Sequence, residues 1–328
     1  MNGFTRSVGL ALAAAGTAAG LALSTAAAAE AANKALMVNG LGAGNLTDIA
    51  MANLLGGMFG SYQRQNVPWP QQARPVTGKD SMTLTQSINI GVTNLDAAIF
   101  SSLAQLGPGE HITVVGLSAG ALVVDEEIRR LAANPKAPDK SKINFVVVAD
   151  SSRILFNKNR YDPTIGYQYR VPAETKYNTK VVTGEYDGYA DFPDRPSNTL
   201  AVTNAIAGSQ LVHIPSMLTN LNTVPAKNIK TTTNVLGGVT TSYLVPTPTL
   251  PIVILNPKLK PQEAALRKQI DAAYVRNDPK KASAATTVAP DAGAAPAASA
   301  AAEAAPAAPA RKTGPAARAA RVAAAARG

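Results

Sequence analysis

The 328-residue sequence contains no cysteine and only two histidines. The absence of cysteine excludes disulfide bonds, thiolate metal sites and a cysteine nucleophile. With His111 and His213 as the only imidazoles, the choice of a histidine base is equally narrow. Apolar residues make up 46% of the chain, an ordinary share for a globular protein, and the length is sufficient for a large core.

The first residues predict a secretory signal peptide over 1–31. Arg6 is followed by an apolar stretch over about 8–23 and by Ala-Glu-Ala at 29–31, a typical cleavage site. The alternative is a retained membrane anchor, but the stretch is short for a membrane span and is diluted by Gly, Ala and Thr. We therefore expect the protein to be secreted or associated with the cell envelope.

The last residues, 277–328, contain 25 alanines and six prolines and no aromatic residue. Such a segment cannot bury enough apolar surface to offset its ordering entropy, so we expect a disordered tail. From Pro257 onward 12 Lys and Arg stand against five Asp and Glu, and this difference of +7 accounts for most of the net charge of +10. The tail either adheres to an anionic cell-wall or membrane surface or serves only to solubilise the protein. Nucleic-acid binding is not expected, because the basic residues lack interleaved aromatic residues and export is predicted.

The middle of the chain, 32–256, alternates strand-like and helix-like segments, and a further helix is expected over 257–276. Continuous apolar runs predict strands at 34–40, 111–117, 143–150 and 179–188, and helical spacing predicts helices at 83–106, 121–134 and 198–208. Buried parallel strands with helices on both faces produce this pattern, so the sequence predicts an α/β fold with a mostly parallel central sheet. Residues 48–82 show few regular patterns and are expected to form a loop or cap near the site.

The segment GLSAG at 116–120 fits the pattern G-x-S-x-G and lies between a predicted strand and a predicted helix. The pattern alone has little specificity, because it occurs by chance in many chains. Its position between a strand and a helix is, however, the position that a nucleophile elbow requires. In such a turn the backbone of Ser118 is strained, its neighbours are small, and its hydroxyl is exposed at the carboxyl end of the sheet. The N–H of Ala119 would point into the same space and stabilise an oxyanion. The alternative is a Gly-Ser turn in which Ser118 only caps the helix.

A nucleophilic serine needs a base. His111 lies at the far end of the same strand, about 20 Å from Ser118 at the usual rise of a strand, which excludes it. His213 follows the predicted helix 198–208 and is the remaining candidate. The order Ser, acid, His along the chain is the order that α/β-hydrolases use.

The acid is expected after a strand between Ser118 and His213. Asp187 is favoured because it comes soon after its strand and is followed by a glycine; Asp191 and Asp150 are the alternatives. Each of the three could instead be a turn-forming aspartate.

The glycine-rich loop at 38–45 is expected to supply a second oxyanion donor, through the N–H of Gly40 or Leu41. The alternatives for this loop are a flexible glycine segment and a phosphate-binding loop. Its glycines lack the spacing of a dinucleotide fingerprint, so no cofactor is expected, and no metal site is expected either.

Three segments resemble the PE-PPE domain of mycobacteria and their relatives: VVGLSAGALVVDEEIRRL at 114–131, YDGYADFPDRPSNTLAVTNAIAGSQLVHIPS at 186–216 and TTSYLVPTPTLPIVILNP at 240–257. The resemblance runs over about 35–256. It implies an α/β-hydrolase fold similar to that of serine esterases and cutinases. It also implies Ser118 as nucleophile, an Asp of the 186–194 run as acid and His213 as base. Some members of this broader group look like acyltransferases that build trehalose lipids.

The leading hypothesis is an exported serine esterase or lipase that hydrolyses acyl esters through an acyl-enzyme. The alternative is an acyltransferase with the same triad, in which the hydroxyl of a sugar such as trehalose replaces water. A third hypothesis, from another class, is a catalytically inactive protein that binds the cell envelope. The expected partner in the first two cases is an acyl ester or lipid substrate.

Overall fold

The computed structural model of the chain describes residues 33–279; the predicted signal peptide and all but the first three residues of the predicted tail lie outside them. Seven strands form the central sheet in the order β2-β1-β3-β4-β7-β9-β8. All neighbours are parallel except β8 and β9, which run antiparallel. The strands are β1 (Lys34–Val38), β2 (Gln63–Asn66), β3 (Ile112–Leu117), β4 (Ile143–Val148), β7 (Thr179–Gly184), β8 (Ile229–Thr233) and β9 (Val239–Val245). A separate two-stranded sheet joins β5 (Tyr161–Asp162) to β6 (Tyr167–Gln168).

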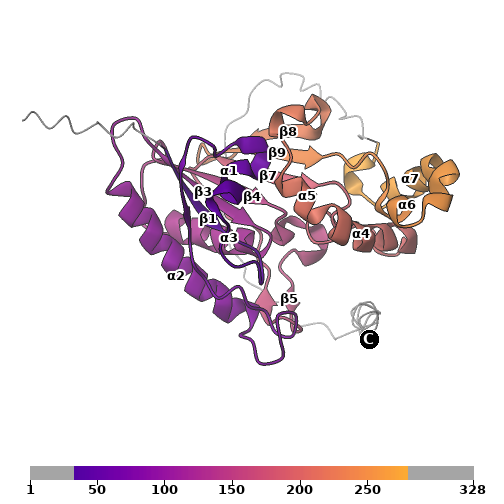
Figure 1. Cartoon of the computed structure of the whole chain (residues 1–328), viewed down its shortest axis with the longest axis horizontal. Coiled ribbons are helices and arrows are strands. Elements are labelled where there is room, and N and C mark those ends of the chain that lie inside the picture. Colours follow the sequence, from indigo (N-terminus) through magenta and orange to yellow (C-terminus); the bar gives the residue numbers. More distant parts are fainter. Residues whose placement is uncertain (1–32, 280–328) are drawn as a thin grey trace, which may run out of the picture. The chain divides into compact units, whose positions relative to one another are not determined.

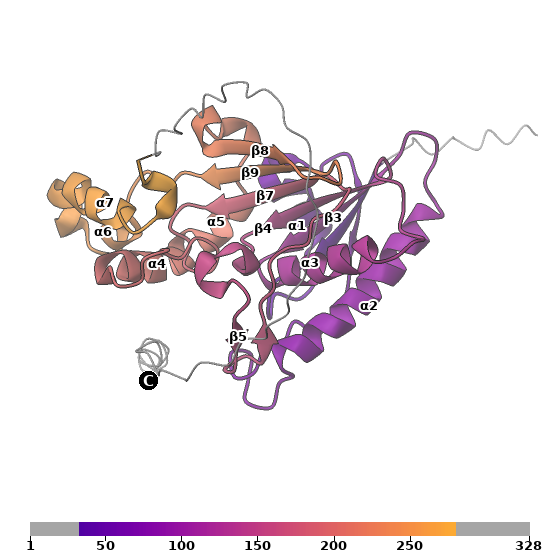
Figure 2. The same ribbon diagram turned by 180° about the vertical axis from the view of Figure 1, so that it is seen from behind.

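Helices cover both faces of the sheet (Figures 1 and 2). They are α1 (Asp48–Gly57), α2 (Leu84–Leu103), α3 (Ala119–Ala132), α4 (Thr199–Leu211), α5 (His213–Met217), α6 (Pro251–Leu255) and α7 (Glu263–Asp271). The predicted α/β fold, of the α/β-hydrolase type with a mostly parallel sheet, is confirmed. None of the helices in the part of the chain that the structure describes is long and apolar enough to span a membrane.

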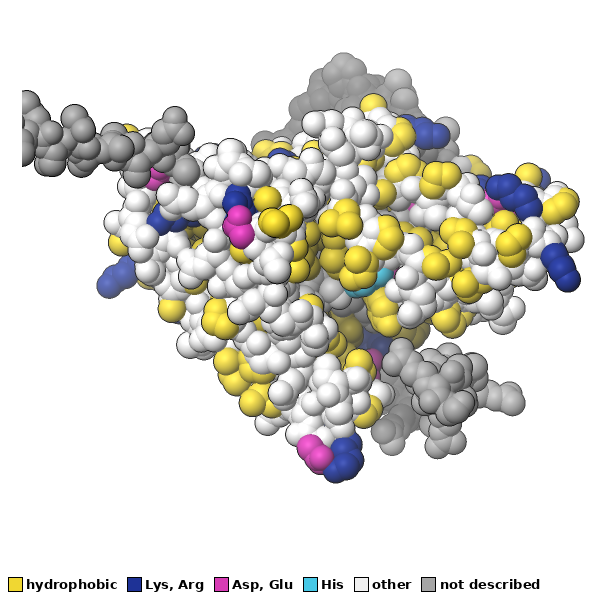
Figure 3. All heavy atoms as spheres, in the orientation of Figure 1, with side chains coloured by type: hydrophobic (Ala, Val, Ile, Leu, Met, Phe, Trp, Pro, Cys, Tyr) yellow, Lys and Arg dark blue, Asp and Glu magenta, His cyan; other side chains and the backbone are white. Residues whose placement is uncertain are grey.

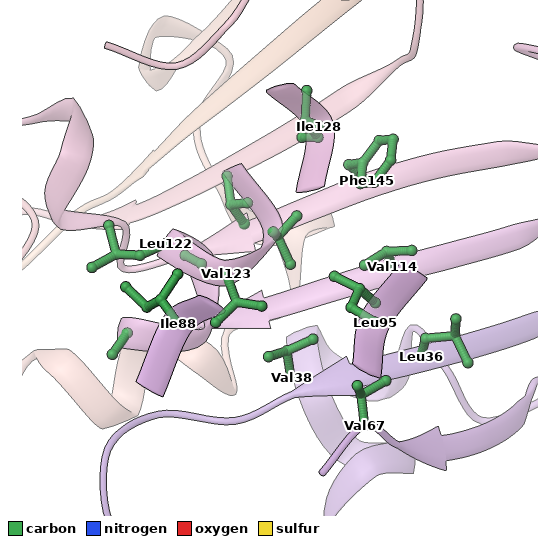
Figure 4. Close-up of a cluster of buried hydrophobic side chains, with 14 of the residues drawn as sticks. Leu36, Val38, Val67, Ile88, Leu95, Val114, Leu122, Val123, Ile128 and Phe145 are labelled. Carbon is green, nitrogen blue, oxygen red and sulfur yellow. The ribbon is translucent and has the colours of Figure 1, made fainter. Parts of the chain in front are cut away.

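The core is divided between the two faces by the alternation of side chains along each strand. In β1, Leu36 and Val38 pack with α2 and α3, whereas Ala35 and Met37 pack on the other face with α1. Figure 4 shows the cluster on the face of Leu36 and Val38, in which side chains of α2 and α3 meet those of the strands. Because both faces are buried, the central strands are mostly apolar, which explains why they were predictable.

The start of α2 follows from local chemistry. Thr83 accepts a hydrogen bond from the Gln86 N–H at 3.2 Å, and the Gln86 side chain accepts one from the Thr83 N–H at 2.9 Å. This capping box satisfies two backbone donors that the helix cannot pair by itself.

The expectation of a loop or cap without regular structure over 48–82 is wrong, because the segment contains α1 and β2. The strand β2 has the sequence QRQN and lies at an edge of the sheet, so its pairing with β1 rather than an apolar run stabilises it. At the other edge, the polar strand β8 was not predicted for the same reason, and its neighbour β9, which begins with threonines, was not predicted either.

The segment predicted as a helix over 257–276 is helical only in part. Around α7 lie 3₁₀ turns at Pro257–Gln262 and Val275–Asn277. Ile270 and Tyr274 are fully buried in a cluster with Tyr186 and with residues of α4 and α6. The segment therefore belongs to the same compact unit as the sheet, and the described part of that unit ends at Pro279.

Candidate active site

Ser118 lies between the end of β3 and the start of α3, with backbone angles φ 54° and ψ −123°. A positive φ is unusual for a residue with a side chain and stores strain in the turn. The Ser118 hydroxyl makes no hydrogen bond to the N–H groups of α3, so the alternative of a simple helix cap is wrong. The hydroxyl is instead available to groups above the carboxyl end of the sheet.

Two glycines make the turn possible because β1, β3 and α3 approach closely here. A Cβ atom on Gly120 would lie 2.1 Å from the carbonyl oxygen of Val38, and one on Gly116 would lie 2.7 Å from the Cα of Ala121. Neither distance is compatible with any side chain unless the backbone shifts. The small residues of the motif are thus a packing requirement.

His213 is the first residue of the short helix α5 rather than part of a loop, and only Val212 separates it from α4. Its Nε2 lies 2.9 Å from the Ser118 Oγ, and its Nδ1 lies 2.6 Å from the Asp187 Oδ2. The Asp187 side chain is inaccessible to solvent, and His213 is 6% exposed. The three side chains, 95 and 26 residues apart in sequence, thus form one continuous hydrogen-bonded chain.

The Asp187 carboxylate is oriented by the turn that carries it. Its Oδ1 accepts a hydrogen bond from the Tyr189 N–H at 2.9 Å, which leaves Oδ2 to accept from the imidazole. A carboxylate on Nδ1 favours the tautomer whose proton is on that nitrogen, so Nε2 can accept the proton of the Ser118 hydroxyl. The Tyr189 ring packs edge-on against the imidazole, with ring centroids 5.0 Å apart.

The other candidate acids do not contact the imidazole. Asp191 accepts from the Tyr186 N–H and pairs with Arg276 at 2.5 Å, while burial raises its pKa to about 6 against the opposing effect of Arg276. Asp150 accepts from the Ser152 N–H at 2.9 Å and pairs with Arg153 at 2.7 Å. Of the three aspartates, the structure brings only Asp187 to His213.

His111 precedes β3 at the end opposite Ser118, as the sequence predicted. Its ring packs edge-on against Tyr62 with centroids 6.1 Å apart, and burial lowers its pKa. It takes no part in the arrangement around Ser118.

The glycine-rich loop passes directly against the serine. A Cβ atom on Gly40 would lie 3.1 Å from the Ser118 Cβ and 3.6 Å from its Oγ. The loop is held by the segment after β2, because the Trp69 indole donates to the Asn39 carbonyl at 3.0 Å and the Gly42 N–H donates to the Gln71 carbonyl. The backbone of Gly40 therefore lies at the serine, and Leu41 is the next residue of the loop.

Two features of the site were missed from the sequence. The contact of Tyr189 with the imidazole has a weak signal in the Tyr-Asp-Gly-Tyr run, which places the tyrosine two residues after the acid. The pairing of Arg276 with Asp191 has no local signal, because the two are 85 residues apart. Within residues 33–279, no three His, Asp or Glu side chains are arranged to hold a metal ion.

Comparisons with known proteins place the chain in a family. The model of the PE-PPE domain matches residues 60–275. The chain is 40% identical over 223 residues to the SL1278 acyltransferase Chp1 of Mycobacterium tuberculosis, a match of 64% of this chain and 54% of that protein. It is 35% identical over 230 residues to the Diacyltrehalose acyltransferase Chp2 of the same organism, a match of 64% of this chain and 62% of that protein. The chain thus spans less than two thirds of the length of both relatives.

A third relative in Mycobacterium tuberculosis, Esterase PE16, is 31% identical over 227 residues, with 63% of this chain and 41% of that protein covered. Among solved structures, a cutinase-like protein from Cryptococcus sp. aligns with a TM-score of 0.34 and 16% identity, covering 49% of this chain and 81% of that one. Because the family model matches more than half of the sequence, the resemblance predicted from the three motif segments is confirmed, and the chain belongs to the PE-PPE domain family.

Proposed function

We propose that Ser118, His213 and Asp187 form a catalytic triad and that the protein cleaves acyl esters through an acyl-enzyme. The observation that carries this proposal is the chain of contacts from the Ser118 Oγ through the imidazole to a buried carboxylate, at 2.9 and 2.6 Å. These distances are within the range that a nucleophile and its general base require.

In the first half of the reaction, Nε2 of His213 takes the hydroxyl proton while the Ser118 Oγ bonds to the ester carbonyl carbon. The carbonyl electron pair moves to oxygen and forms the tetrahedral oxyanion. When the oxyanion collapses, the bond to the leaving alcohol breaks, and the imidazolium gives its proton to that alcohol. Water then repeats the sequence on the acyl-enzyme and releases the free acid and Ser118. Asp187 stabilises the imidazolium and fixes the ring.

The oxyanion would be held by backbone N–H groups. Ala119 is the first residue of α3, so its N–H has no partner four residues earlier within the helix, and the helix dipole favours a negative charge at this end. Gly40 or Leu41 would supply the second donor from the loop that lies against Ser118.

Apolar surface around the site supports a lipid or acyl ester as substrate. Next to His213 on α5, Ile214 is 60% exposed, and Leu218, which directly follows α5, is 54% exposed. Figure 3 shows hydrophobic side chains gathered over α4 and α5 on this face. Exposed apolar groups grouped around a site are typical of proteins that bind apolar ligands.

A second candidate is acyl transfer to a sugar such as trehalose, because the relatives at 40% and 35% identity carry the name acyltransferase, against 31% for the esterase. The first half-reaction is the same, and a sugar hydroxyl then replaces water. An assay with a labelled acyl donor and trehalose separates the two. Acyl-trehalose as product indicates transfer, whereas free acid alone indicates hydrolysis.

A fluorophosphonate probe tests the triad and the hypothesis of an inactive envelope-binding protein. We expect covalent labelling of the wild type, complete loss of labelling in Ser118→Ala and strongly reduced labelling in His213→Ala. Circular dichroism of each variant controls for folding. A folded wild type that takes up no probe would refute the triad and favour the inactive binding protein.

We also propose that the protein is exported and that its basic tail adheres to an anionic envelope surface, on the strength of the sequence at 1–31 and 277–328. Sedimentation with anionic vesicles tests the tail, with the chain ending at Pro279 as the comparison. Adhesion should decrease from low to high salt and should require the tail. Equal binding of both chains would rule out this role.

A further inference from the structure

A cavity of about 180 Å³ is lined by Tyr189, the tyrosine next to the imidazole of His213. One wall comes from the loop after β4 and contains Ser151, Phe156 and Asn157; the other comes from the loop after β7 and contains Tyr189 and Phe192. Tyr189 connects the cavity to the reaction centre, because its ring also packs against His213 at 5.0 Å. The cavity is therefore one side chain away from the imidazole, and none of Ser118, Asp187 and His213 lines it.

The order of the strands determines which part of an ester this cavity faces. β3, which carries Ser118 at its end, lies between β1 and β4. The loop of the expected oxyanion donors follows β1, whereas both walls of the cavity follow β4 and β7 on the other side. A carbonyl oxygen directed at Gly40 thus points away from the cavity. The part of the ester that faces the cavity is therefore one of the other two, the acyl chain or the alcohol.

The alcohol part of the ester has to lie next to the imidazole. The same Nε2 gives a proton to the leaving alcohol and takes one from the incoming hydroxyl, so both occupy the same position in turn. We propose that the cavity is the subsite for this alcohol and that it binds a sugar ring, an inference that rests on the proposed function. It applies to hydrolysis of a sugar ester and to transfer onto a sugar alike.

The composition of the walls fits a sugar better than an aliphatic chain. Four of the eight lining residues are aromatic and two are polar, and the full lining is Phe156, Tyr169, Tyr189, Phe192, Ser151, Asn157, Ile154 and Gly188. A pyranose ring presents apolar C–H faces that pack on aromatic rings and a rim of hydroxyls that need hydrogen-bond partners. No charged side chain lines the cavity, which favours a neutral ligand. Its volume equals that of about six water molecules, enough for one ring.

The β4 wall is held in place by a buried polar network. Ser152 donates to the Asp125 carboxylate at 2.6 Å, and Arg153 pairs with Asp150 at 2.7 Å beneath the loop. On the loop itself, the Asn157 amide donates to the Ser151 carbonyl at 2.8 Å, which fixes its orientation. The Asn157 side chain is therefore preorganised, which lowers the entropy cost of binding a ligand.

The test compares two esters with the same acyl chain, 6-O-octanoyl glucose and ethyl octanoate, in the wild type, Phe156→Leu and Phe156→Trp. Phe156 is partly exposed and packs on Phe192 with ring centroids 5.7 Å apart, so its replacement should not prevent folding. In Phe156→Leu we expect kcat/KM to fall about tenfold for the sugar ester, as for the loss of one aromatic contact, and to change less than about twofold for the ethyl ester. Phe156→Trp, which keeps a ring, should retain the activity on the sugar ester.

Three results would overturn the subsite: an equal loss for both esters, no loss for either, or a changed preference for acyl chain length within an ethyl ester series. The last would mean that the cavity holds the acyl chain. Phe192→Leu serves as a second variant if Phe156→Leu is poorly folded.

Saturation-transfer NMR with methyl glucoside on the Ser118→Ala background distinguishes this failure from failure of the proposed function. Contact that is lost in the added Phe156→Leu variant supports the subsite even without turnover. Turnover of the ethyl ester without sugar contact refutes the subsite and leaves the triad intact. A wild type that turns over neither ester refutes the proposed function.

Discussion

The site has a nucleophile side, the turn around Ser118, and an acid–base side, the turn around Asp187. Different interactions hold the two sides in place. Around Ser118, three backbone segments approach so closely that there is no room for a side chain at Gly116 or Gly120. Around Asp187, by contrast, the turn is held by polar and charged side chains from a distant part of the sequence. The first side depends on the exact volume of its residues, and the second depends on charges that stay paired.

The acid–base side extends to the segment after α6. The Tyr186 hydroxyl donates to Asp271 at 2.6 Å and accepts from Arg267 at 3.0 Å, and Asp191 pairs with Arg276. Tyr186 and Asp191 flank Asp187 in one turn, in which Tyr186 has a φ of 66°. The C-terminal segment thus acts on the site through the backbone of that turn, without contact with the reacting groups.

The sharpest test of this division is a pair of substitutions within one turn, Asp187→Asn and Asp191→Asn. We expect Asp187→Asn to lower kcat by about 10⁴-fold, because the amide no longer favours the imidazole tautomer that accepts from the serine. Asp191→Asn should lower kcat less than about tenfold, since Asp191 only positions the turn. The measurement is ester hydrolysis by variants whose circular dichroism matches the wild type. A comparable loss in both would make Asp191 part of the catalytic machinery.

The nucleophile side should fail when volume is added. Gly120→Ala places a methyl group 2.1 Å from the Val38 carbonyl oxygen, so β1 and α3 must separate. We expect the free energy of unfolding in urea to fall by about 3 kcal/mol or more. Gly60→Ala is the matched control, because its Cβ would meet only one atom, at 3.4 Å, and stability should change by less than about 0.5 kcal/mol. Equal effects at the two positions would contradict the packing argument.

The acid–base side should fail when a charge is left unpaired. Arg276→Met keeps much of the alkyl packing but removes the partner of Asp191, and we expect a loss of about 2 kcal/mol at pH 8. Burial already raises the pKa of Asp191 to about 6, and the loss of Arg276 would raise it further. A carboxyl with a raised pKa contributes stability that is present below its ordinary pKa and lost as the pH rises through the folded value. The destabilisation by Arg276→Met should therefore be smallest near pH 4 and grow above pH 6.

Urea unfolding at several pH values measures this dependence. Asp191→Asn in the Arg276→Met background is the control, because it removes the unpaired charge and should restore part of the stability at pH 8. A loss from Arg276→Met that is the same at pH 4 and pH 8 would mean that packing, rather than charge, connects the C-terminal segment to the turn.

The same division explains what the sequence could predict. The turn at 116–120 is formed by neighbours in sequence, so its strand, glycines and helix could be recognised together. The preference for Asp187 over Asp191 could not be settled, because the two lie in one turn and differ mainly in a partner 85 residues later, Arg276. Edge strands such as β2 were missed because backbone pairing, and not an apolar pattern, holds them in the sheet.

The smallest effect on stability and activity is expected from removal of the alanine-rich residues that follow Pro279. Arg195 pairs with Asp278 at 2.5 Å, whereas residues 280–328 are dominated by alanine and proline. A chain ending at Pro279 should keep its thermal midpoint within about 1 °C and its activity on a short soluble ester, because the removed composition buries little apolar surface. A chain ending at Gln262 loses Ile270 and Tyr274, both fully buried beside Tyr186, and should be strongly destabilised. If the cut after Pro279 were as damaging as the cut after Gln262, the acid–base side would need the tail as well as α7.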